Sequence, residues 1–185
     1  MCYSIIVYSF YAYIQKYIWT LQIEQLVNVT DTCNNIGQSW LLELDHFVEI
    51  TADNCATLTS STEFYGVADQ NIITDLESLE LTKNLALTDV LNSAAWLLVV
   101  LVLEIDVWLQ LKHKLKGGIF LANKIIKFSA YLLLLLAAIY WGFTGQFLDF
   151  WDAFLWIVAF LFIEMNLFKW QEETEEEDKI KESIF

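Results

Sequence analysis

Charged side chains within long apolar segments are the strongest chemical signal in this sequence. Ionisable groups are costly in hydrocarbon, so there they pair with one another or line a path for ions or protons. Six residues form one predicted intramembrane polar cluster: Glu104, Asp106, Lys124, Lys127, Glu164 and Asn166. Two interpretations fit these residue types, an ion or proton vestibule and an ion-pair lock that fixes the packing of helices.

The members of this predicted cluster lie at similar depths within their apolar segments. Counted from the nearer end of each apolar segment at about 1.5 Å per residue, Glu104 lies roughly 12 Å deep and Asp106 roughly 9 Å. By the same count Lys124, Lys127 and Glu164 lie at roughly 9, 13 and 9 Å. The spacing of the lysines puts them on one helix face, whereas the first two acids point nearly opposite ways. We therefore expect one of these acids to pair with the lysine-bearing helix.

A second charged group is expected at the opposite ends of the same segments. Asp149 and Asp152 share one helix face near the start of the last apolar segment, and Lys16 near the end of the first could reach them. In an ion path these acids would form an outer mouth that prefers cations. The alternative is that they are simply solvated at the membrane interface.

The polar segment 24–90 contains two cysteines, Cys33 and Cys55. Neither belongs to a Cys-x-x-Cys pair, and His46 alone cannot complete a zinc site, so no metal site is predicted. In an oxidising compartment the two cysteines would form a disulfide. It would close a loop of about 22 residues and contribute roughly 3 kcal/mol in the chain-entropy model. The alternative is two buried free thiols.

Motifs of the common enzyme classes are missing from the sequence. It has no Gly-rich phosphate loop, zinc-protease helix or nucleophile elbow. His46 and His113 are expected on opposite sides of a membrane, which excludes a bis-histidine haem within one chain. We therefore predict no enzyme, no catalytic residues and no cofactor. A net charge of -14 without a basic face argues against nucleic-acid binding.

Long apolar helices must position these side chains. The 185 residues are 57% apolar, and residues 1–23, 91–111, 119–140 and 147–170 are long enough to cross hydrocarbon, which takes about 20 residues. Residues 1–23 also suit a helix that lies in the interface. The predicted fold class is an all-α integral membrane protein with a four-helix transmembrane bundle. Residues 91–170 form its three-helix block.

The segment 24–90 is predicted to be a small helical extramembrane domain between the first and second membrane helices. It has no proline, and apolar residues recur in it at helical spacing. These residues are Trp40, Leu41, Leu44, Phe47 and Val48, and then Ile72, Ile73, Leu76 and Leu79.

The positions of the lysines predict how the chain is oriented in the membrane. Lys112, Lys114 and Lys116 separate the second and third apolar segments, and by the positive-inside rule this loop is cytoplasmic, or faces the organelle interior. Residues 24–90 are then extracytoplasmic and both termini lie inside. The acidic tail 171–185 is expected to extend the last helix into the cytoplasm. The predicted location is a bacterial inner membrane or an organellar inner membrane.

The middle of the predicted bundle has no polar side chain in residues 97–103, 132–138 or 155–162. Transporters usually bring ligands and broken helices to this level, so a transporter is not favoured. We predict a non-catalytic subunit with a structural or sensing role in a larger membrane assembly. Its partners would be the lipid bilayer and either other membrane subunits or further copies of itself. The alternative is a homo-oligomeric cation channel with an acidic inner vestibule and outer mouth.

Overall fold

The computed structural model describes the backbone of residues 2–184 apart from 27–28, 30, 60, 68–69 and 112–117. Side chains of residues 2–3, 109–111, 118–120, 164 and 167–184 also lie outside the description. The chain divides into two compact units, Met1–Leu101 and Val102–Phe185, and each is described by itself.

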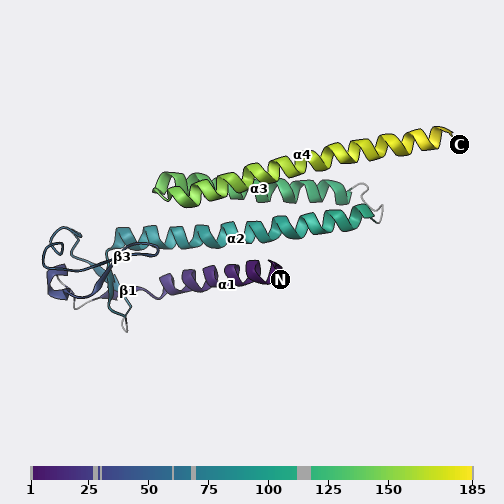
Figure 1. The fold of residues 1–185 in the computed structure, drawn as a ribbon. Helices are drawn as coiled ribbons and strands as arrows, with labels where there is room; N and C mark the ends of the chain where they lie inside the picture. Colours follow the sequence, from purple (N-terminus) through teal and green to yellow (C-terminus); the bar gives the residue numbers. More distant parts are fainter. Residues whose placement is uncertain are drawn as a thin grey trace. The chain divides into compact units, whose positions relative to one another are not determined.

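The described residues form four helices and a five-stranded sheet (Figure 1). The helices are α1 (Cys2–Leu21), α2 (Leu76–Leu111), α3 (Gly118–Thr144) and α4 (Phe147–Ile184). A short 3-10 helix, η1, covers Thr32–Asn35. The strands are β1 (Glu24–Leu26), β2 (Ser39–Glu43), β3 (His46–Glu49), β4 (Phe64–Gly66) and β5 (Ile72–Thr74).

The prediction of a helical domain in residues 24–90 is wrong, because residues 24–74 form this sheet and α2 begins only at Leu76. We call residues 24–75 the β domain. Its strand order is β1-β4-β5-β2-β3. Strands β2 and β5 are parallel, and the other neighbours are antiparallel.

The error has a physical cause in strand β2, which is buried on both faces. Trp40 packs on one face in a core that includes Ile73, and the adjacent Leu41 packs on the other in a core with Ile23 and Leu79. Strands covered on both faces read as continuous apolar runs instead of alternating ones. Apolar doublets of this kind also match helical spacing, which is why periodicity alone favoured a helix.

The predicted disulfide between Cys33 and Cys55 is confirmed, with 4.9 Å between the two Cα atoms. It lies in the core that contains Trp40 and Phe64, whose rings meet edge to face. The Asp31 side chain accepts a hydrogen bond from the Cys33 amide at 3.0 Å, which holds the start of η1. The disulfide thus fixes η1 against the face of the sheet that carries Trp40 and Phe64.

Two helical segments among the described residues are long and apolar enough to cross a membrane, Leu76–Trp108 and Leu121–Thr144. Only 22% and 28% of the residues in their most apolar windows are buried, so both differ from the core helices of a soluble protein. Crossing by α1 and α4 remains a prediction. Helix α4 continues to Ile184, so the acidic tail does extend the last helix as expected.

Helices α3 and α4 form a tight helical hairpin. Gly145, with φ +86°, ends α3 in a left-handed turn, and the Gln146 amide donates to the Trp141 carbonyl at 3.0 Å. A Cβ atom on Gly142 would come within 3.4 Å of the Phe150 ring. Four small residues of the two helices are buried: Ala130, Ala137 and Ala138 on α3, and Ala153 on α4. Small side chains let helix backbones approach closely, as membrane helices commonly do.

Loss of the disulfide is expected to loosen the β domain in the full-length protein. Cys33→Ser should lower the free energy of unfolding of this domain by about 3 kcal/mol, because the loop between Cys33 and Cys55 is no longer closed. In detergent micelles, amide hydrogen exchange of the β2 backbone should then be roughly 100-fold faster. Cys2→Ser is the matched control, and equal exchange in the two variants would contradict the prediction.

Candidate functional site

Two charge clusters stand out among the described side chains, one in each unit. We call Lys16, Asp45 and Asp89 the hairpin junction, because they join the β2–β3 hairpin to two helices. We call Asp106 and Lys127, with Asn123 beside them, the α2–α3 ion pair.

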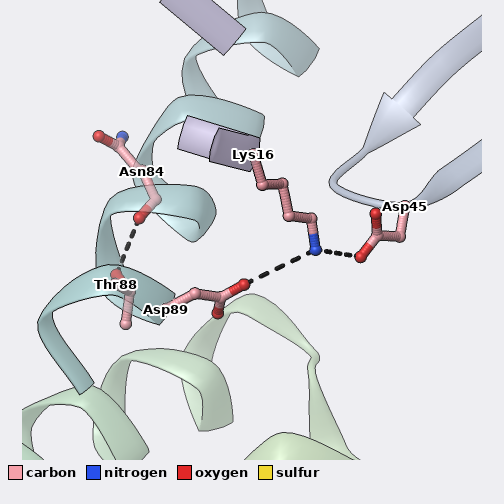
Figure 2. A network of polar contacts seen from close by, with 5 residues as sticks. All are labelled: Lys16, Asp45, Asn84, Thr88 and Asp89. Atoms are coloured by element: carbon pink, nitrogen blue, oxygen red, sulfur yellow. Dashed lines mark hydrogen bonds and ion pairs between the residues drawn. The ribbon is translucent and has the colours of Figure 1, made fainter. Parts of the chain in front are cut away.

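In the hairpin junction, one lysine bridges three separate elements, and Figure 2 shows its two ion pairs. Lys16 on α1 donates a hydrogen bond to Asp45 Oδ2, and its Nζ lies 3.8 Å from Asp89 Oδ2 on α2. Asp45 occupies the two-residue turn of the hairpin with φ +66°, a conformation that Asp adopts more readily than most residues. The cation therefore ties the hairpin tip to both helices at one point.

Two neighbouring polar residues of α2, Thr88 and Asn84, form a bond of their own. The Thr88 hydroxyl donates to the Asn84 carbonyl at 2.8 Å, a local bond within the helix that Figure 2 also shows. Lys16 is thus shared by two carboxylates, Asp45 and Asp89. Asp45 is exposed, so water as well as Lys16 stabilises its charge.

The α2–α3 ion pair satisfies both oxygens of one buried carboxylate. Asp106 Oδ1 accepts a hydrogen bond from Asn123, and Asp106 Oδ2 pairs with Lys127. The side chains of Asp106 and Lys127 are only 11% and 18% exposed. Asn123 and Lys127 are one helical turn apart on α3, so they share a face and converge on the same acid.

The described residues bring together two members of the predicted intramembrane polar cluster, Asp106 and Lys127. The side chains of Glu104, Lys124 and Asn166 are exposed. The side chain of Glu164 lies outside the described residues, as does the lysine loop 112–117. Grouping of all six residues into one site stays a prediction.

Asn123 was not among the predicted residues, because only charged groups and one residue close to Glu164 were considered. Its position four residues before Lys127 is a signal that could have found it.

One residue of the predicted outer mouth, Lys16, makes contacts that the sequence did not suggest. Lys16 pairs with Asp45 and Asp89. Asp149 and Asp152 are exposed near the start of α4. A grouping of Lys16 with these two acids would join the two units and stays a prediction. Asp45 was overlooked because its place depends on a hairpin that helical periodicity concealed.

The described residues contain no group of three or more His, Cys, Asp or Glu side chains placed to hold a metal ion. No protein-family model, curated protein or solved structure matches this chain. Its function is therefore inferred from the two charge clusters, the β domain and the exposed apolar helices.

Removing Asp106 is expected to destabilise the helical hairpin that carries its partners. Asp106→Ala would leave Lys127 without its carboxylate in an apolar setting, which typically costs roughly 3 kcal/mol. The double variant Asp106→Leu/Lys127→Met should recover most of that loss, because it removes both charges. Equilibrium unfolding of the full chain in mixed micelles measures these differences.

Asp149→Ala is the matched control, since Asp149 is exposed and its loss should change stability by no more than about 0.5 kcal/mol. If Asp106→Ala and Asp149→Ala unfold alike, the α2–α3 ion pair has no structural role.

Proposed function

We propose that this chain is a non-catalytic integral membrane protein that serves as a structural or sensing subunit of a larger membrane assembly. In this proposal all four helices engage the membrane, the β domain is extracytoplasmic and both termini lie inside. One observation carries the proposal: long apolar helices leave most of their side chains uncovered by the chain itself. Apolar surfaces of this extent need lipid or protein around them.

The paired state of the charges supports a non-catalytic role. Both oxygens of Asp106 are occupied, and Lys16 is shared between two acids. A general acid or base needs access to a substrate proton, which a fully paired, buried group lacks. Contacts of this kind fix the positions of helices instead.

Two independent signals support the orientation. A disulfide between Cys33 and Cys55 persists in oxidising compartments, which favours an extracytoplasmic β domain. The lysines in residues 112–117 favour the cytoplasmic side for the loop that follows α2. These signals agree, because α2 starts directly after the β domain and its roughly 54 Å length exceeds the hydrocarbon thickness of about 30 Å.

A structural or sensing role follows from the attachment of the β domain. An apolar core of Ile23, Leu41 and Leu79 joins the sheet to the end of α1 and the start of α2. The hairpin junction joins the same elements a second time. A partner that binds the β domain would therefore act on two helices at once.

A cation channel is the competing function, and the α2–α3 ion pair speaks against it. A cation-selective vestibule needs acidic side chains with unbalanced negative charge. Lys127 neutralises Asp106, which was expected to line that vestibule.

The assembly role predicts a defined complex. When the tagged full-length chain is extracted into lipid nanodiscs, native mass spectrometry should show it in fixed stoichiometry with other subunits or copies. Planar bilayers that contain the same complex should show no cation current. A strictly monomeric species would contradict the assembly, and cation currents lost in Asp149→Asn/Asp152→Asn would establish the channel instead.

The orientation predicts opposite labelling of two introduced cysteines in a Cys2→Ser background. Ile36→Cys on the β domain should react with a membrane-impermeant maleimide in intact cells. Leu115→Cys in the lysine loop should react only after the membrane is opened. Leu101→Cys, on an exposed apolar part of α2, is the control and should stay unlabelled in both cases. Labelling of Ile36→Cys and Leu115→Cys from the same side would overturn the topology.

A further inference from the structure

The β2–β3 hairpin runs alongside α2 toward its apolar part. Leu41 in β2 shares an apolar core with Leu79 of α2, and Asp45 at the hairpin tip pairs with Lys16, which also reaches Asp89. From Leu79 to Asp89 is roughly 15 Å along the helix. From Leu41 to Asp45 is roughly 13 Å along the strand. The tip thus lies close to the level of Asp89.

Asp89 marks a change in what α2 exposes. The exposed side chains that precede it include three polar ones: Glu77, Glu80 and Asn84. Those of residues 90–103 are all apolar: Leu91, Leu98 and Leu101. Leu76 and Leu87 are also exposed before it, and the next exposed polar side chain after Asn84 is Glu104. We therefore take Asp89, the last charged residue before this apolar stretch, as the boundary between water and hydrocarbon.

The length of the remaining helix agrees with this boundary. Residues 90–111 extend roughly 33 Å, close to the hydrocarbon thickness of about 30 Å. A headgroup layer roughly 5–7 Å thick lies just outside that boundary. The hairpin tip, at the level of Asp89, falls within this layer.

Phe47 gives the hairpin an uncovered apolar side chain near the same layer. In the β2–β3 register Phe47 lies opposite Leu41, so both project from the face of the sheet that packs on α1 and α2. Leu41 is fully buried, whereas Phe47 on the edge strand is 45% exposed. A half-exposed aromatic ring on the face that packs on α1 and α2 is suited to the boundary between a bilayer and water.

We propose that the β2–β3 hairpin is a lipid-contacting element of the β domain. Its tip, residues 44–45, lies in the headgroup layer of the outer leaflet, and the Phe47 ring packs at the outer edge of that layer. Lys16 holds the tip at this depth through Asp45. The inference rests on the proposed function, because it requires α2 to cross the bilayer with the β domain outside.

Fluorescence quenching by lipids tests the contact in the full-length chain. Single cysteines replace Phe47, Glu49, Ile36 or Leu101 in a Cys2→Ser background and carry the dye NBD, in phosphatidylcholine nanodiscs. Glu49→Cys is the matched control, since it is exposed on the same strand and roughly 7 Å farther from the tip. Only variants whose Cys33 and Cys55 stay unreactive toward maleimide are compared, which establishes that the β domain is folded.

Headgroup-labelled nitroxide lipid should quench the dye strongly in Phe47→Cys, less in Glu49→Cys and not in Ile36→Cys. Lipid labelled deep in the acyl chain should quench Leu101→Cys. If Leu101→Cys is quenched while Phe47→Cys behaves like Ile36→Cys, the hairpin proposal is overturned and the membrane proposal stands. A blue-shifted but unquenched dye at Phe47→Cys would assign the hairpin to a protein partner and also overturns the proposal. If the acyl-chain label does not quench Leu101→Cys, the proposed function itself is contradicted.

Discussion

Continuity of α2 is the constraint on which the other contacts depend. A helix that enters hydrocarbon must satisfy its backbone within itself, so it cannot bend freely to suit its side chains. Its acids must therefore find partners where the helix places them. Asp75, just before α2, accepts hydrogen bonds from the Thr59 hydroxyl and the Ser78 amide, and on the helix Asp89 pairs with Lys16 and Asp106 pairs with Lys127. Thr59 belongs to the β domain, Lys16 to α1 and Lys127 to α3, so these carboxylates connect α2 and its start to three other parts of the chain.

The two charge clusters differ in what they contribute. Lys16 keeps a quarter of its side chain exposed and Asp45 is open to water, so their attraction adds at most about 1 kcal/mol. The main effect of the Lys16–Asp45 pair is to fix the position of the hairpin tip. Asp106 is buried, and its charge would be costly there without Lys127 and Asn123. The α2–α3 ion pair thus removes the energetic cost of a buried unpaired charge. The hairpin junction instead selects one position of the hairpin among positions of similar energy.

Helices could be predicted from the sequence because long apolar runs and their polar ends are local features. The expected span 91–111 ends where α2 ends at Leu111, and α4 begins at Phe147 as expected. The disulfide followed from cysteine content and compartment. The sheet could not be predicted in the same way, because burial of β2 on both faces depends on segments distant in sequence. The error concealed the β2–β3 hairpin and with it the partner of Lys16.

Strand β2 links the disulfide to the helices through adjacent side chains. Trp40 belongs to the core around Cys55, while Leu41 belongs to the core with Ile23 and Leu79. A strand cannot loosen on one face and stay fixed on the other, because its backbone bonds to β3 and β5 serve both. The placement of α1 beside α2 therefore depends partly on a disulfide that touches neither helix.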